Sequence, residues 1–97
     1  MDEIAVKEEI EKSEEYQKNA SLQESLKIAD EIFDGKLREF LLKLILAATK
    51  GKVKNVQDVP KVAQTTKIVD QISFHAPHVK KRMYKKLEKI MRKEGFK

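Results

Sequence analysis

Seven lysine and arginine side chains recur near the C-terminal end of the chain at helical spacing. When residues are placed at about 100° intervals around a helix, these cations share an arc of roughly 140° that contains no acidic residue. They are Lys81, Arg82, Lys85, Lys86, Lys89, Arg92 and Lys93. Like charges at this spacing repel one another by a few tenths of a kcal/mol per pair, so we expect an anionic group to compensate them.

The opposite side of the same segment is apolar and indicates how the helix is placed. Pro77 can open the helix, which we expect to span residues 77–94, and Gly95 can end it, with Phe96 folding back as a hydrophobic contact. The apolar arc is also about 140° wide. It consists of Val79, Met83, Tyr84, Leu87, Ile90 and Met91. One side is therefore expected to face the protein core and the other to face away from it.

Catalytic and metal-binding patterns are not evident elsewhere. His75 and His78 are three residues apart, but the chain has no cysteine, and no nearby carboxylate completes a four-ligand zinc set. Ser73 and His75 lack the oxyanion loop and orienting acid of a hydrolase, and there is no glycine-rich phosphate loop. We expect a protein that is not an enzyme and that has no metal site and no cofactor.

The composition indicates one helical domain. The chain has 97 residues, of which 40% are hydrophobic and 38% charged, too apolar for a disordered polyelectrolyte and too short for two cores. No stretch approaches the roughly 18 apolar residues of a membrane span, and the N-terminus lacks the features of a secretory signal. Together with the lack of cysteine, this predicts a cytoplasmic protein without membrane insertion.

Charge is distributed asymmetrically along the chain. Residues 1–34 carry eleven acidic and four basic side chains, for a net charge of −7, whereas residues 35–97 carry five acidic and seventeen basic ones, for a net charge of +12. A block this basic attracts polyanions. The acidic block could instead fold over the basic helix of its own or a neighbouring chain, and that alternative stays open at this point.

Helices are expected throughout the first half of the chain. Residues 1–20 read as an acidic, weakly packed N-terminal helix, because their apolar stripe is thin. Ser21 and Glu24 form a capping box that would start the next helix, which carries Phe33 on its apolar face and ends at Gly35. Residues 36–50 form the most apolar helix, with Gly51 as its C-terminal stop, and we expect this helix at the centre of the core.

The second half is expected to contain a connection and shorter helices. Residues 52–60 read as a loop held to the core by its valines, and Pro60 fits the first turn of a short helix. Thr65 and Thr66 could cap a second short helix over residues 67–73. The fold class is therefore all-α: a compact bundle of four to five helices, with residues 21–97 as a single helical domain that ends in the basic helix 77–94.

The segment from Thr66 to Val79 (TKIVDQISFHAPHV) resembles a generic helix-turn-helix DNA-binding domain. The resemblance covers residues 66–96, and residues 36–50 would supply the first helix of a three-helix unit without a wing. It implies that Ile68, Val69 and Ile72 face the core and that Phe74 is the apolar turn residue. It also implies DNA contacts. Those toward base edges would come from His78, Lys81, Arg82 and Lys85, and those toward phosphates from Lys86, Lys89, Arg92 and Lys93.

The leading hypothesis is thus a small, basic nucleic-acid-binding protein that uses its last helix with low sequence specificity, as a transcriptional regulator would. DNA is favoured over RNA as its ligand, and the choice between the two stays open at this point. A homodimer is expected from the wide apolar face of residues 36–50. The alternative is a protein-interaction module, such as an adaptor, antitoxin-like or immunity-like bundle, that docks its basic helix on an acidic protein partner. Peripheral attachment to a membrane is a third reading of the same amphipathic helix.

Overall fold

The most apolar helix lies at the centre of the structure. A computed structural model describes residues 1–93, and in it the helix expected over residues 36–50 is α4 (Gly35–Thr49). Seven of its apolar side chains are buried, while Lys36 and Lys43 remain exposed. It packs against α1 (Glu3–Lys12), α3 (Ala20–Ala29) and α5 (Val59–His75). The predicted position of this helix in the core is confirmed.

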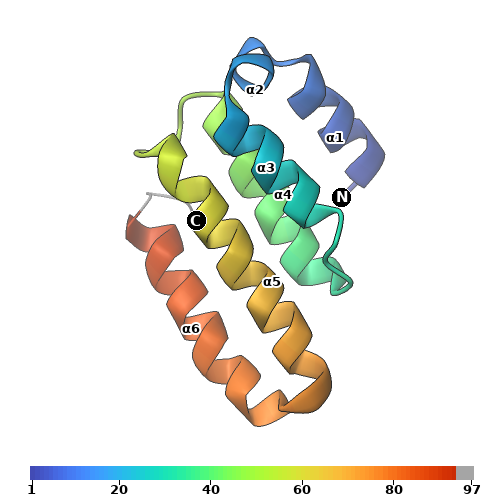
Figure 1. Ribbon diagram of the computed structural model, residues 1–97, viewed down its shortest axis with the longest axis vertical. Helices are drawn as coiled ribbons and strands as arrows, with labels where there is room; N and C mark the ends of the chain where they lie inside the picture. The colour runs from blue at the N-terminus through green and yellow to red at the C-terminus, as the bar shows by residue number, and fades with distance from the viewer. Residues whose placement is uncertain (94–97) are drawn as a thin grey trace.

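The other elements complete an all-α bundle, so the predicted all-α class is confirmed, although the predicted number of four to five helices was too low. Within residues 1–93 there are six α-helices and one 3-10 turn, and no strands. The short α2 (Glu14–Lys18) links α1 to α3, and the turn η1 (Val56–Asp58) precedes α5. The last helix, α6 (Pro77–Lys93), lies along α5 at one edge of the molecule (Figure 1).

The N-terminal segment forms two helices rather than the single one predicted. The backbone at Ser13 is extended, which ends α1 and begins α2. Asp2 caps α1 by accepting a hydrogen bond of 3.2 Å from the Ala5 N–H. Ile10 is completely buried among the core residues, so the thin apolar stripe of this segment nevertheless anchors α1 on α4.

The predicted boundaries around α3 were wrong at both ends. The N-cap is Asn19, whose side chain accepts a 2.9 Å hydrogen bond from the Ser21 N–H, so Ser21 lies inside the helix. The helix ends at Ala29, four residues before Phe33, and Phe33 is 83% exposed instead of packed. Gly35 does not end α3: it is the first residue of α4, directly after the N-cap Asp34.

Residues 59–75 form one continuous helix, α5, instead of two short ones. Pro60 lies in its first turn, as predicted. Thr65 and Thr66 do not cap a new helix, because their hydroxyl groups donate to the carbonyl oxygens of Lys61 and Val62 one turn earlier. The connection before α5 is held to the core by the buried Val53 and the partly buried Val56, and Val59 is buried as the first residue of α5, which confirms the predicted role of these valines.

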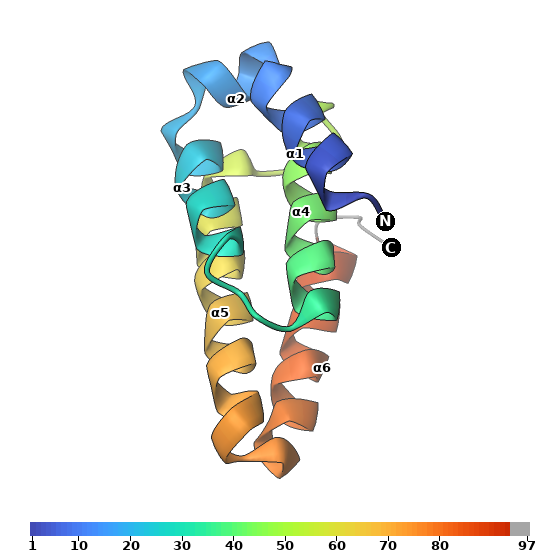
Figure 2. The same cartoon turned by 90° about the vertical axis from the view of Figure 1, so that its right-hand side faces the viewer.

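The last helix begins at Pro77, as predicted, and is described as far as Lys93 (Figure 2). The predicted helix end at Glu94, the glycine stop at Gly95 and the contact of Phe96 lie outside the described residues.

Gly35 and Gly51, both predicted to end a helix, differ in backbone conformation. Gly51, which follows the C-cap Lys50 of α4, has a φ of 71°, so it is the left-handed stop predicted there. Gly35 has no positive φ and begins a helix, and a Cβ atom added at either residue would meet nothing within 4 Å. An added Cβ atom would fit at both glycines, so the two positions differ in backbone conformation and not in the space available.

We expect alanine substitutions at these two glycines to change stability in opposite directions. Gly35→Ala should raise the free energy of unfolding by about 0.4–1 kcal/mol, because alanine restricts the unfolded chain and favours helix. Gly51→Ala should lower it by about 1 kcal/mol, because alanine is strained at positive φ. Urea unfolding followed by circular dichroism measures both, and a change of the same sign in the two variants would contradict the assignment.

Candidate functional site

The basic helix is attached to the rest of the protein along one side. α5 and α6 run in opposite directions side by side and are joined at Ala76, where the helical backbone is broken (Figures 1 and 2). α5 is the main packing partner of α6, while α1, α2 and α3 pack elsewhere. Within residues 1–93, α6 thus lies at the edge of the bundle, with its side away from α5 directed outward (Figure 1).

The apolar arc of α6 faces the core, as predicted. Leu87 is buried, and Met83, Tyr84 and Ile90 are half-buried and packed against the core. Val79 is half-buried as well. The side chain of Met91, predicted for the same arc, lies outside the described part of the structure.

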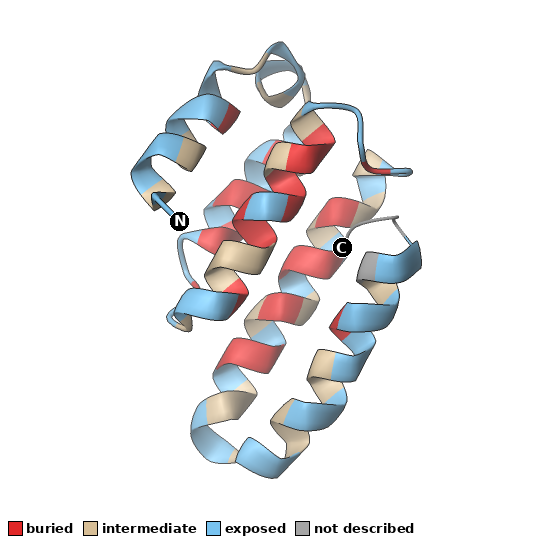
Figure 3. Ribbon diagram, turned by 180° about the vertical axis from the view of Figure 1, so that it is seen from behind, coloured by how far each residue is buried: buried red, intermediate tan, exposed pale blue. Residues whose placement is uncertain are grey.

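The predicted cations are all exposed on the outward side of α6. We call Lys81, Arg82, Lys85, Lys86, Lys89, Arg92 and Lys93 the basic face. None of them forms an ion pair within residues 1–93. His78 is also exposed, in the first turn of α6, and the outward side of this helix is largely solvent-accessible (Figure 3). The structure therefore leaves the basic face open.

The acidic N-terminal block neutralises other parts of the molecule. Glu3 lies 3.3 Å from the Arg38 guanidinium on α4, and Glu9 lies 3.3 Å from Lys50 just beyond the end of α4. Glu31 pairs with Lys67 on α5. These carboxylates do not cover the basic face, so the alternative in which residues 1–34 of the same chain shield it does not occur in this structure.

One cation of α6 lies on the apolar side instead, and the sequence reading did not single it out. Lys80 Nζ is 3.0 Å from Asp34 Oδ2 and 5.5 Å from the centre of the Tyr84 ring. The signal that could have identified it is its position, because Lys80 is the only cation of this helix that falls inside the apolar arc of the helical wheel. A charged side chain there requires a partner from the neighbouring structure.

Asp34 supplies that partner and also caps α4. Its Oδ1 atom accepts hydrogen bonds from the backbone N–H groups of Lys36 (2.9 Å) and Leu37 (3.3 Å). Burial raises the pKa of the Asp34 carboxyl, but the hydrogen bonds from Lys80 and from these two backbone groups outweigh it and hold the pKa below its usual value. The hydrogen bond to Asp34 in turn raises the pKa of Lys80. Asp34 thus joins the start of α4 to the start of α6.

Asp70 on α5 positions Asp34. Its carboxylate is 1% exposed and accepts hydrogen bonds from the backbone N–H groups of Phe33 (3.1 Å) and Asp34 (2.7 Å). These contacts hold the connection between α3 and α4 against α5. A continuous set of polar contacts therefore runs from α5 through this connection to α6, and we call Asp70, Asp34 and Lys80 the polar link.

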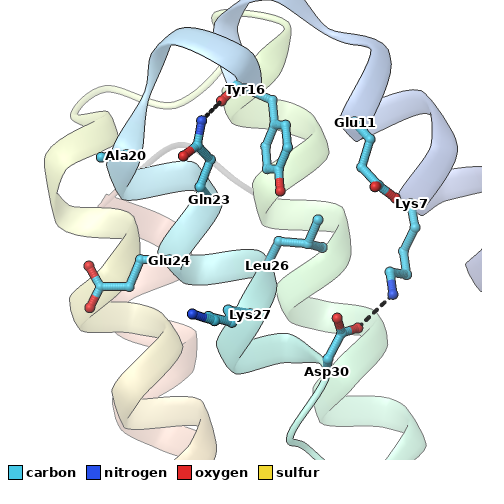
Figure 4. Close-up of a pocket in the computed structure, with 9 residues that line it drawn as sticks. All are labelled: Lys7, Glu11, Tyr16, Ala20, Gln23, Glu24, Leu26, Lys27 and Asp30. Atoms are coloured by element: carbon cyan, nitrogen blue, oxygen red, sulfur yellow. Dashed lines mark hydrogen bonds and ion pairs between the residues drawn. The ribbon is translucent and has the colours of Figure 1, made fainter.

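An open groove of about 570 Å³ lies between α1, α2 and α3 (Figure 4). The ion pair of Lys7 and Asp30, at 2.8 Å, spans it, and Gln23 donates to the Tyr16 carbonyl oxygen. Burial, followed by the nearby carboxylates of Glu11 and Asp30, raises the pKa of Tyr16. The residues lining the groove include no histidine, serine or cysteine.

The two histidines stand apart from any metal-binding group. His75 and His78 are both exposed near the turn between α5 and α6. Within residues 1–93, no three histidine, cysteine, aspartate or glutamate side chains come together as ligands for a metal ion.

The residues that carry the helix-turn-helix resemblance are only partly placed as it implies. Val69 is buried and Ile72 half-buried, but Ile68 is 45% exposed, so its predicted place in the core was wrong. Phe74, expected as the apolar residue of the turn, lies inside the last turn of α5 and is 69% exposed. The reason is that α5 and α6 pack lengthwise as an antiparallel hairpin (Figure 2), whereas the helices of that motif cross at about 90–120° over an apolar turn. The family resemblance itself stays a prediction.

Comparisons of this chain with models of protein families, with curated proteins and with solved structures find no match. In the part of the chain that the structure describes, none of the helices combines the length and the apolar character of a bilayer-spanning segment.

We expect Asp70→Ala to destabilise the fold by about 2–4 kcal/mol, because it leaves the Phe33 and Asp34 N–H groups without their acceptor. Asp70→Asn retains one acceptor oxygen and should cost less. Urea unfolding of the two variants and the unsubstituted protein gives the comparison. Equal stability of the alanine variant and the unsubstituted protein would show that Asp70 does not hold this connection.

Asp34 should contribute a pH-dependent part of the stability. Since its pKa is lowered on folding, its ionised form stabilises the protein above the unfolded-state pKa of about 4, and this contribution is lost as pH falls through the folded-state pKa. Asp34→Asn retains a capping side chain but removes the charge. The variant should be less stable by about 1 kcal/mol or less at pH 7 and of equal stability near pH 2. Denaturant titrations at the two pH values test this, and a difference that persists at the lower pH would disprove it.

Proposed function

We propose that this protein binds nucleic acid through the basic face of α6 and that DNA is its preferred ligand. The observation that supports this is the separation of the two sides of the helix. Seven cations and His78 are exposed on the outward side, no carboxylate of residues 1–93 pairs with the basic face, and the apolar side is packed against the core. Phosphates are the anions that suit such a row, because each contact releases condensed counterions.

The charge of the whole chain supports the same proposal. The formal net charge is +5 and the sequence pI about 9.4. The seven exposed cations of the basic face lie on α6, at one edge of the molecule (Figure 1). Lysine supplies five of the seven cations. Since lysine contacts phosphate as a point charge and reads base edges poorly compared with arginine, asparagine or glutamine, low sequence specificity follows.

The proposed interface does not require dimerisation. The wide apolar face of α4, which suggested a homodimer, is covered inside one chain by α1, α3 and α5. The homodimer stays a prediction, and binding through α6 is proposed for a single chain.

A second candidate, a protein-interaction module, is favoured by a different observation. Phe33 and Phe74 are 83% and 69% exposed, and exposed aromatic side chains are common anchors in protein interfaces. In that case, an acidic protein partner would meet the same basic face, or a partner would meet the exposed aromatic residues on another side of the molecule. The binding test below separates the two candidates, because it contains nucleic acid alone.

Removing charge from the basic face should weaken binding more than removing the same charge elsewhere. The triple variant Lys81→Gln, Lys85→Gln, Lys89→Gln should bind a 20-base-pair DNA duplex at least about tenfold more weakly in 50 mM salt, as expected for the loss of up to three phosphate contacts. The matched control is Lys12→Gln, Lys18→Gln, Lys27→Gln, which removes three exposed lysines from α1, α2 and α3. Fluorescence anisotropy of labelled DNA measures both.

The salt dependence gives a second measure in the same experiment. The logarithm of the binding constant for duplex should fall with the logarithm of salt concentration by about 0.9 for each phosphate neutralised, and the basic-face variant should show a smaller slope than the control. Equal weakening by the two triple variants would indicate an effect of net charge alone. If neither duplex nor single-stranded DNA binds the unsubstituted protein at low salt, the proposed function is wrong.

A further inference from the structure

The cations of the basic face are arranged in two rows along α6. Around the helical wheel the two rows are separated by about 90°. The first row contains Arg82, Lys86, Lys89 and Lys93, at spacings of four, three and four residues, and the second contains Lys81, Lys85 and Arg92. Along the axis, Lys81 and Lys93 are about 18 Å apart. The basic face is therefore broad as well as long.

The two-row arrangement of these cations suits a duplex better than a single strand. Double-stranded DNA carries one phosphate for roughly each 1.7 Å of its axis, and each strand one for roughly each 3.4 Å. Over about 18 Å, a duplex thus offers roughly ten phosphates in two strands and a single strand roughly five. Two rows of cations on a rigid helix can face two strands at once, whereas a single strand can follow one row only.

The basic face also lacks the groups on which single-stranded bases stack. Sites that bind single-stranded nucleic acid combine a basic groove with several aromatic side chains, and successive bases stack on these aromatic rings. No phenylalanine, tyrosine or tryptophan belongs to the two rows, and the only ring on this side of α6 is the imidazole of His78 at the start of the helix. A flexible single strand bound here would lose conformational entropy, and no stacking of its bases on aromatic rings would compensate that loss.

The exposed aromatic side chains lie on a different side of the molecule. Lys80 is about 170° from the middle of the basic face on the wheel, and it contacts Asp34, the residue that follows Phe33. Phe74 is one helical turn after Asp70 and so on the side of α5 that binds the same connection. Neither Phe33 nor Phe74 is therefore placed to stack a base of a nucleic acid bound along the basic face.

We propose that the basic face recognises the paired phosphate strands of a duplex and discriminates against single-stranded nucleic acid. The inference rests on the proposed function and adds the class of ligand to it. It attributes the discrimination to two features, the two-row arrangement of cations and the lack of aromatic side chains between them.

The first test compares one 20-base-pair DNA duplex with each of its separated 20-nucleotide strands, by fluorescence anisotropy with the full chain in 50 mM salt. The duplex should bind at least about fivefold more tightly than either strand. Equal or tighter binding of a single strand would overturn this inference and leave nucleic-acid binding intact. Lack of binding to all three molecules would instead overturn the proposed function, and the inference with it.

The second test adds an aromatic side chain to the middle of the basic face. Lys89→Trp and Lys89→Gln remove the same charge from an exposed position, so their difference isolates stacking. The tryptophan variant should bind the single strands at least about fivefold more tightly than the glutamine variant does, which is the gain expected from one stacked base. The affinities of the two variants for the duplex should be equal within about twofold. No gain for single strands would overturn the inference, as would an equal gain for single strands and duplex. Circular dichroism of both variants verifies that α6 is folded.

Discussion

The orientation of α6 depends on the polar link that joins Asp70, Asp34 and Lys80. α6 is an edge helix with α5 as its main packing partner, and an apolar arc of about 140° alone would tolerate some rotation about the helix axis. The 3.0 Å pair of Lys80 and Asp34 restricts that rotation at the start of α6. Asp70 holds Asp34 in place through the backbone of the same connection. With Lys80 directed inward, the two rows of cations are directed outward.

The charge asymmetry of the sequence is resolved locally in the folded protein. Acidic side chains of the first 34 residues pair with Lys7 on α1, with Arg38 on α4, with Lys50 just beyond α4 and with Lys67 on α5. On α6 they pair with Lys80, which does not belong to the basic face. The carboxylates that could have neutralised the basic face are thus used, or lie on helices that do not pack against α6. An excess of positive charge remains on one helix even though acidic residues are abundant in the chain.

Helical periodicity was sufficient to predict the two elements that matter most, α4 and α6, because each has a wide and regular apolar arc. It failed where a side chain has two local options. The hydroxyl of Thr66 could cap a new helix or donate to a carbonyl oxygen of the preceding turn. In the structure it donates to the preceding turn, because α5 continues through Thr66 and buries it. Gly35 could end α3 or begin α4, and the choice depends on Asp34 and Asp70, which are 36 residues apart. Lys80 depends on the same long-range contact.

The energetic cost of the basic face is small enough for the core to sustain it. Seven like-charge pairs at spacings of three or four residues occur among its cations, which at a few tenths of a kcal/mol each amounts to roughly 1.5–3.5 kcal/mol. Burial of Leu87 alone contributes roughly 1.5–3 kcal/mol, and the half-buried Met83, Tyr84 and Ile90 add to it. Since the apolar contacts and the repelling charges lie on opposite sides of α6, the helix can stay folded while its cations remain uncompensated. A bound row of phosphates would remove that repulsion without altering any contact in the core.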